Sequence, residues 1–173
     1  LPMLSELTEA IHRAGAKAAI LVSTGGGASA MGFPYDRGKE GLAEIQNVGV
    51  TEKQSLVAQR AVRQLSVPEI KAIIEMYGLA ARRVMLAGFD AMYIHALNYL
   101  TAQFMSPLYN TRDDEYGGDF ERRMRFVKEL IASCRKNVGP RFPLVIRMSI
   151  DECFPGARTL EETIQVVKFL EAA

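Results

Sequence analysis

The chain has 173 residues, of which 49% are hydrophobic, and its charged side chains nearly cancel to a formal net charge of +1. This length suits one domain with a hydrophobic core, and the balanced charge gives no electrostatic reason to expect a nucleic-acid or membrane partner. Without a membrane-length apolar stretch, a signal-peptide pattern or metal-spaced cysteines, the default expectation is a soluble, cytoplasmic protein in a reducing compartment.

Hydrophobic periodicity predicts helices and short strands that alternate along the chain. In the helix at 67–87, Ser66 and Glu69 fit a capping box, and Asp119 can cap the helix at 119–138. In chain order the predicted elements are a helix at about 4–14, a strand at 18–22, a helix at about 67–87, a strand at 91–94, a helix at 119–138, a strand at 143–146 and a helix after Thr159.

Two of these helices have predicted inward faces. The first carries Leu4, Leu7 and Ile11 on one side. In the last helix the inward residues are predicted to be Ile164, Val167 and Leu170, with Glu162 as a capping-box glutamate.

The three strands are continuously apolar, which is typical of parallel strands buried on both faces. The order therefore predicts an α/β fold of parallel βα units, either a doubly wound sheet or part of a (β/α)8 barrel. In both architectures, ligands bind at the carboxyl ends of the strands. A long connection at 23–66 follows the first strand, with a short helix predicted near 51–60, and a connection of this length is usually functional or flexible.

Four polar residues lie near the predicted strand ends. His95 and Arg147 are each placed one residue past a strand, and Asn98 and Tyr99 follow His95 closely. His95 and Asn98 offer two N–H donors, a workable cradle for a carbonyl oxygen or an anion, and the Tyr99 hydroxyl could give up a proton. Arg147 in a barrel interior would require an anionic partner. For His95 alone, the competing interpretation is a core-edge histidine bonded to a backbone carbonyl.

Two other motifs favour ordinary structure. Gly25, Gly27 and Ala30 fit the spacing of a dinucleotide-binding loop, but the glycine- and proline-rich residues that follow do not start the helix this site requires. The charged segment 110–123 is interpreted as a solvated loop that leads into a helix. Its acidic residues 113–115 could ligate a metal, but adjacent loop residues rarely converge and no histidine joins them. A flexible loop and a solvated loop are the favoured interpretations, and no metal site is predicted.

The stretch from residue 88 to 126 resembles the old yellow enzyme family of flavin oxidoreductases. The matching residues are Gly88-Phe89-Asp90, Ile94-His95, Asn98, Tyr99-Leu100, Gln103-Phe104, Ser106-Pro107, Asn110, Arg112, Asp114-Glu115-Tyr116-Gly117-Gly118, Glu121, Arg123 and Arg125-Phe126. Weaker similarity on both sides extends the resemblance over nearly the whole chain. It implies one domain, 1–173, that forms roughly strands three to five of a (β/α)8 barrel with their helices.

The resemblance also implies a chemistry. Members of the family pass hydride from NADH or NADPH to FMN and then to an activated C=C bond of an α,β-unsaturated carbonyl substrate. By the resemblance, His95 and Asn98 hold the substrate carbonyl, Tyr99 is the proton donor, and Arg147 faces the N1/C2 carbonyl edge of the flavin. Polarising the carbonyl makes the β-carbon electrophilic, so the paired donors suit this reaction.

Some positions depart from the family pattern. Asn98 is followed directly by Tyr99, where the family has an intervening glycine, and Leu21, Thr24 and Gly27 replace three polar residues at the end of the third strand. The chain starts without Met and ends inside a predicted helix, which indicates a section of a longer protein. An alternative therefore stays open: a non-catalytic partial barrel whose sheet edges are covered by self-association, by a partner or by the remainder of a barrel.

Overall fold

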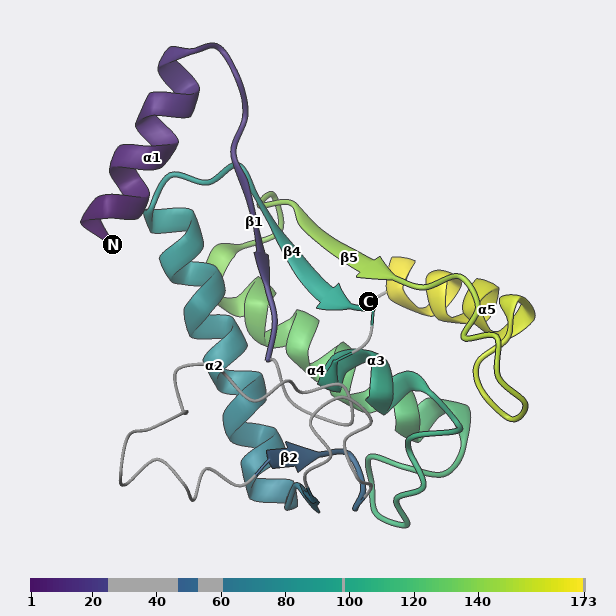
Figure 1. Ribbon diagram of the computed structural model, residues 1–173. Helices are drawn as coiled ribbons and strands as arrows, with labels where there is room; N and C mark the ends of the chain where they lie inside the picture. Colours follow the sequence, from purple (N-terminus) through teal and green to yellow (C-terminus); the bar gives the residue numbers. More distant parts are fainter. Residues whose placement is uncertain (25–46, 53–60, 98, 173) are drawn as a thin grey trace.

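Three parallel strands form the main sheet of the protein. The computed structural model describes residues 1–24, 47–52, 61–97 and 99–172. The strands β1 (Ala19–Val22), β4 (Ala91–Ala96) and β5 (Leu144–Met148) lie in the order β1-β4-β5, which follows their order in the chain (Figure 1). The parallel arrangement predicted from the apolar runs is thus confirmed.

Two long helices cover one face of this sheet. The helices α2 (Val67–Leu86) and α4 (Phe120–Val138) pack against each other beside the strands (Figure 1). Their starts follow the sequence: the Glu69 carboxylate accepts hydrogen bonds from the Ser66 N–H and hydroxyl at 2.8 and 2.7 Å, and Asp119 accepts the Arg122 N–H at 2.9 Å. Each bond stabilises a helix start, where backbone N–H groups have no partner within the helix.

The two faces of β4 differ in burial. Met92, Ile94 and Ala96 point toward the helices and are fully buried in the hydrophobic core. Because successive strand residues alternate between faces, Tyr93 and His95 point the other way. Tyr93 is 37% exposed and lies in register beside Leu21, so this second face, called here the open face, is only partly covered by the described residues.

Three elements were not predicted. A second parallel pair, β2 (Asn47–Gly49) with β3 (Val62–Gln64), lies within the 23–66 connection, and the helix α3 (Leu100–Met105) follows β4. The connection is thus structured in part, and the helix predicted near 51–60 falls mainly on residues outside those described. Three-residue strands and a six-residue helix are too short to show a period in the sequence.

The predicted inward faces of the two terminal helices are wrong in part, because only Ile11 and Leu170 of the six predicted residues pack against the core. In α1 (Pro2–Arg13), Leu4 and Leu7 are exposed, and Thr8 is buried because its hydroxyl donates to the Ala87 carbonyl at 2.6 Å. In α5 (Leu160–Glu171), Ile164 and Val167 are about half exposed, while Thr163 and Val166 point inward. An internal hydrogen-bond partner at Thr8 and at Thr163 decides which side is buried.

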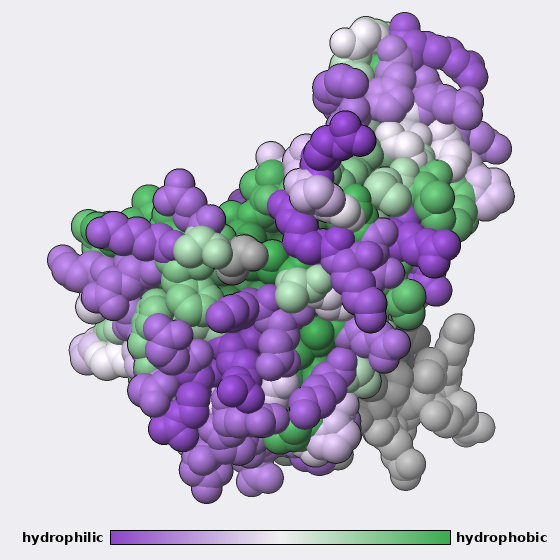
Figure 2. All heavy atoms as spheres, turned by 180° about the vertical axis from the view of Figure 1, so that it is seen from behind, coloured by the Kyte–Doolittle hydropathy of each residue, from purple (hydrophilic) through white to green (hydrophobic). Residues whose placement is uncertain are grey.

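Hydrophobic side chains also reach the surface. Figure 2 shows them gathered in a band across the middle of one face, with hydrophilic residues over most of the upper and lower parts. Among the helices of the described residues, none is both long enough and apolar enough to cross a membrane.

Candidate functional site

His95 and Arg147 lie side by side on adjacent strands. The sequence placed them just past the strand ends, and this is wrong: both lie inside strands, because Ala96 and Met148 extend the β4–β5 ladder by a further pair. His95 is the register partner of Arg147, so both side chains leave the sheet on its open face. The sheet itself therefore fixes their separation near its carboxyl edge.

His95 is only 9% exposed, and its surroundings favour the neutral form of the ring. Burial lowers the pKa of His95, and the positive charge of Arg147 lowers it further. The Leu97 N–H lies 3.4 Å from Nδ1 and can donate to it. With Nδ1 accepting, the proton of the neutral ring resides on Nε2, which makes Nε2–H a hydrogen-bond donor near neutral pH.

Tyr99 lies beside this ring. It is the N-cap residue of α3, and the centroids of the Tyr99 and His95 rings are 5.1 Å apart at an interplanar angle of 53°. The start of α3 thus brings the predicted proton donor next to the predicted carbonyl donor. Asn98, the second predicted donor, lies outside the described residues.

Arg147 is exposed at the same edge. Among the described residues, no carboxylate lies within ion-pair distance of its guanidinium. The sequence predicted that an arginine in a barrel interior would require an anionic partner. In the structure the Arg147 side chain is instead exposed to solvent on the open face, so it is stable without one. A guanidinium in this position is free to bind an electron-rich group beside His95.

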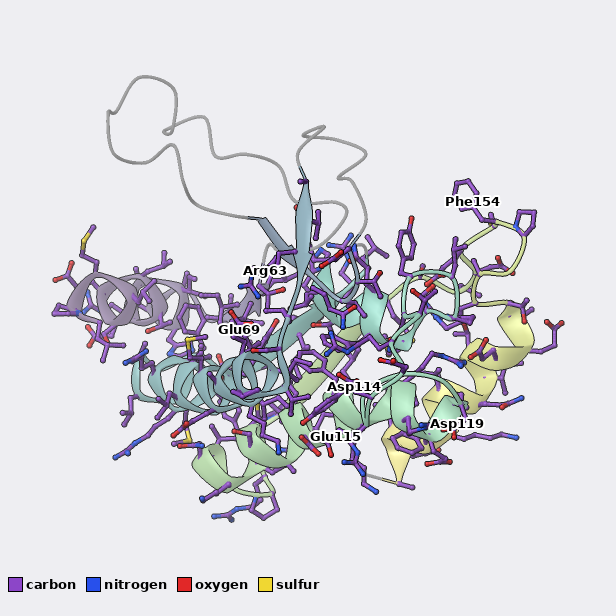
Figure 3. All side chains as sticks on the ribbon, turned by 90° about the horizontal axis from the view of Figure 1, so that it is seen from below. Arg63, Glu69, Asp114, Glu115, Asp119 and Phe154 are labelled. Atoms are coloured by element: carbon purple, nitrogen blue, oxygen red, sulfur yellow. The ribbon has the colours of Figure 1, made fainter. Side chains whose placement is uncertain are left out.

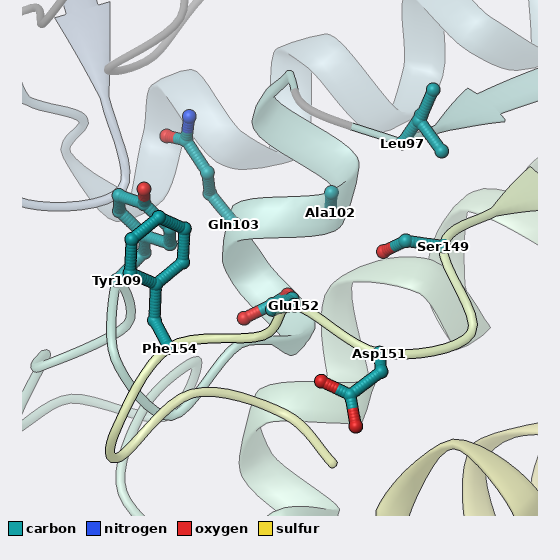
Figure 4. Close-up of a pocket in the computed structure, with 8 residues that line it drawn as sticks. All are labelled: Leu97, Ala102, Gln103, Tyr109, Ser149, Asp151, Glu152 and Phe154. Atoms are coloured by element: carbon teal, nitrogen blue, oxygen red, sulfur yellow. The ribbon is translucent and has the colours of Figure 1, made fainter. Parts of the chain in front are cut away.

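A cavity of about 220 Å³ opens at the same end of the strands, between α3 and the loop after β5 (Figure 4). Its lining combines apolar, aromatic and acidic side chains and includes Leu97, two residues after His95. The lining residues are Leu97, Ala102, Gln103, Tyr109, Ser149, Asp151, Glu152 and Phe154.

A largely buried hydrogen-bond network joins the two sides of this cavity. Glu152, in the loop after β5, accepts a hydrogen bond from the Ser106 hydroxyl at 2.6 Å and one from the Arg158 N–H at 3.2 Å. The Arg158 side chain is fully buried, and its guanidinium donates to the Ser149 carbonyl at 3.1 Å. The sequence did not predict this network, because nothing in the spacing of Ser106 and Glu152 indicates that the two side chains meet.

The charged segment after α3, residues 106–118, is a closely packed loop, called here the clasp. The Asn110 amide donates to the carbonyls of Phe104 and Tyr116, both at 2.7 Å, and closes the loop between them. A side chain at Gly117 would collide with Arg112, because a Cβ there would lie 2.4 Å from the Arg112 carbonyl oxygen. These residues of the family motif therefore shape the connection between α3 and α4.

The acidic run 113–115 belongs largely to the same clasp. Asp114 pairs with the buried Arg112 guanidinium, which lowers the pKa of the carboxyl, and Glu115 pairs with Arg125 at 3.0 Å. Figure 3 labels Asp114 and Glu115 on this connection, well away from Phe154. The solvated loop predicted from the sequence is thus wrong for Arg112, whose side chain is 1% exposed.

Comparison with known proteins shows which family has this architecture. The model of the NADH:flavin oxidoreductase / NADH oxidase family matches residues 1–173. The chain belongs to this family. Residues 88–126, which suggested the resemblance, contribute both the His95 strand and the clasp that supports it.

Two curated relatives span the chain. It is 40% identical to the NADH oxidase of Thermoanaerobacter brockii over 169 residues, which cover 97% of this chain and 25% of that protein. It is 32% identical to the cinnamate reductase of Clostridium sporogenes over 185 aligned residues, covering 98% of this chain and 27% of that protein. The chain thus spans about a quarter of the length of these family members.

A solved structure identifies the fold. The old yellow enzyme homologue from Zymomonas mobilis superimposes with a TM-score of 0.80 and 27% identity, covering 96% of this chain and 48% of that one. The three consecutive parallel strands and their helices are therefore part of a (β/α)8 barrel, as the resemblance implied. In such barrels the active site lies at the carboxyl ends of the strands, with residues from several strand ends and the loops that follow them.

Replacing Arg147 with glutamine is expected to raise the pKa of His95, because the nearby positive charge that disfavours the imidazolium is removed. Titration of the ring protons by NMR measures this, and since the chain has two histidines, a His12→Gln variant assigns the signals. An unchanged or lower His95 pKa in the Arg147 variant would show that the two side chains do not interact.

The lowered pKa of His95 also makes the stability of the fold depend on pH. The folded protein holds the pKa of His95 below its ordinary value, so the unfolded chain binds a proton first as the pH falls. The free energy of unfolding therefore decreases as the pH falls from the ordinary histidine pKa toward the lower pKa of His95 in the folded protein. This decrease should be smaller in the Arg147→Gln variant.

Proposed function

We propose that this chain carries the central part of the active site of an FMN-dependent oxidoreductase. The enzyme would use NADH or NADPH to reduce the activated C=C bond of an enone or enoate. The observation that carries the proposal is the largely buried His95, whose pKa is lowered, held in register beside an exposed Arg147 that has no ion-pair partner among the described residues, at the carboxyl edge of the strands. Family membership and a relative named cinnamate reductase support it.

The residues present suit a flavin. Arg147 is a guanidinium without a carboxylate partner among the described residues, on the face that lines a barrel interior, and it would hold the electron-rich N1/C2 carbonyl edge of FMN. When bound, FMN supplies the acceptance and donation of hydride. The fixed positive charge of Arg147 favours binding of the cofactor at this edge.

His95 would bind the substrate. Its Nε2–H can donate to a carbonyl or carboxylate oxygen, and Asn98 is proposed as the second donor. A donor aimed at this oxygen withdraws electrons from the conjugated double bond and makes the β-carbon electrophilic. Because the His95 pKa is low, the residue works as a neutral donor over the physiological range.

Tyr99 is proposed to deliver the proton that completes the reduction at the α-carbon. Its ring lies 5.1 Å from that of His95, so one substrate can contact both side chains. The tyrosine hydroxyl is weakly acidic and could serve as the general acid. Tyr99→Phe should slow the step that consumes the alkene and leave the affinity for FMN unchanged.

A second candidate function is a non-catalytic partial barrel that acts by self-association or through a partner. Leu21 and Tyr93, which are 42% and 37% exposed on the open face, favour this alternative because such apolar surface is usually covered. It requires neither FMN nor substrate. The two functions therefore differ in whether the purified chain reduces an alkene at all.

The test is a single-turnover experiment. The FMN-loaded protein is reduced without oxygen and mixed with cinnamate or 2-cyclohexenone, while flavin reoxidation and formation of the saturated product are followed. We expect product in a one-to-one ratio with reoxidised flavin, at a rate well above that of dissolved reduced FMN. Reoxidation no faster than in the protein-free control would contradict the catalytic proposal and favour the non-catalytic one.

A further inference from the structure

A second cavity lies on the helix side of the sheet. It is a pocket of about 250 Å³, open to solvent on one side, between the end of β1, the helix α2 and the start of α3. Val22, which lines it, packs toward the core rather than the open face. These three elements meet near the carboxyl end of β1 in Figure 1. The lining residues are Val22, Ser23, Thr24, Val48, Ile73, Met76, Tyr77, Ala80 and Leu100.

The lining formed by the described residues is mainly apolar, with the hydroxyls of Ser23, Thr24 and Tyr77, and none of these residues is charged. Met76, on the exposed surface of α2, is 57% exposed and marks the mouth of the cavity, whereas Tyr77 is 4% exposed and lies at its inner side. A ligand of this cavity is therefore expected to be neutral and mainly hydrophobic, because no charged side chain of the described lining would offset the cost of desolvating a charge.

Tyr77 supplies the polar feature. Its hydroxyl is buried and has no hydrogen bond of ordinary geometry with the described residues, although the Thr101 hydroxyl and the Thr24 backbone lie close enough to offset part of the rise in its pKa that burial causes. The hydroxyl of Thr24, in the same lining, is likewise buried and unpaired within the described part of the chain. A buried hydroxyl without a well-aligned partner is destabilising, so a ligand oxygen that pairs with it adds a hydrogen bond to the apolar contact.

We propose that this cavity binds a small neutral ring compound bearing one hydroxyl or carbonyl oxygen, with the ring against the α2 side chains and the oxygen hydrogen-bonded to the Tyr77 hydroxyl. The volume fits such a molecule: a closed cavity of about 150 Å³ holds benzene, and about 250 Å³ accommodates one substituted ring. Burial raises the pKa of Tyr77, so its hydroxyl remains protonated and can donate or accept. This site is independent of the flavin chemistry proposed above.

The test compares phenol with benzene as probes. Both are titrated into the full chain while the 13C-methyl signal of Met76 reports binding at the mouth of the cavity, and the ratio of the two dissociation constants is determined. Loss of the Tyr77 hydroxyl in Tyr77→Phe is expected to lower the preference for phenol over benzene by about five- to tenfold, the effect of one hydrogen bond. Binding of benzene should persist.

A matched control makes the same chemical change elsewhere. Tyr109 lines the other cavity, so Tyr109→Phe should leave the probe ratio unchanged. Ala80→Phe, which fills the cavity, should abolish the response of Met76 to both probes while circular dichroism confirms the fold. If Met76 responds to neither probe in the unaltered chain, or if the ratio is the same in Tyr77→Phe, the proposal is wrong.

Discussion

In the FMN-loaded protein, replacing His95 by alanine is expected to slow reduction of an enone by about 10²–10³-fold, the usual effect of removing one donor to a developing oxyanion. The loss should appear in the alkene-reducing step, because the Nε2–H of His95 bonds the oxygen on which negative charge accumulates. Stopped-flow measurement of flavin reoxidation at saturating 2-cyclohexenone gives this rate directly.

Two further variants separate donor chemistry from packing. His95→Gln keeps an N–H donor and should retain more activity than His95→Ala. His12→Gln removes the other histidine of the chain, which bonds Asp90 at 2.8 Å near the opposite end of β4, and should leave the rate unchanged. Equal rates for His95→Ala and the unaltered protein would remove His95 from the catalytic site.

Replacing Arg123 by alanine is expected to lower the free energy of unfolding by about 3–5 kcal/mol, the cost of removing one partner of a buried ion pair. Arg123, in α4, is 9% exposed and pairs with Glu162 at the start of α5. It also donates to the Gly118 carbonyl at 2.7 Å and the Met105 carbonyl at 3.3 Å. One side chain thus connects α3, the glycine turn, α4 and α5.

Urea unfolding of the purified chain measures this effect. The neighbouring Arg122 pairs with Asp119 at the surface, where the two side chains are 47% and 61% exposed, so Arg122→Ala is the matched control and should change stability little. Similar losses for the two variants would mean that the Arg123–Glu162 pair does not hold the helices together.

The sequence predicted the regular part of the fold well. The long helices at 67–86 and 120–138 have an apolar face with a helical period, and Glu69 and Asp119 mark where they start. The parallel strands followed from short apolar runs between helices. The short elements β2, β3 and α3 could not be predicted, because they form through contacts between distant residues, such as the Thr51 hydroxyl donating to the Tyr109 carbonyl at 2.8 Å.

For the candidate site, the sequence identified residue types better than their surroundings. It singled out His95, Tyr99 and Arg147, and the structure places the first two in ring contact and pairs His95 with Arg147 across two strands. It did not show that much of the 106–118 motif is structural. A single sequence cannot pair Arg112 with Asp114 and Gly117 in space, because a charged loop and a folded clasp have the same composition.

Binding of a flavin at the edge formed by His95 and Arg147 is tested by the visible absorption spectrum of FMN titrated with the purified chain. We expect a saturable spectral shift at one FMN per chain, bleaching by NADH without oxygen, and weaker binding by the Arg147→Gln variant. A spectrum that remains that of free FMN throughout the titration would show that this edge does not bind the flavin.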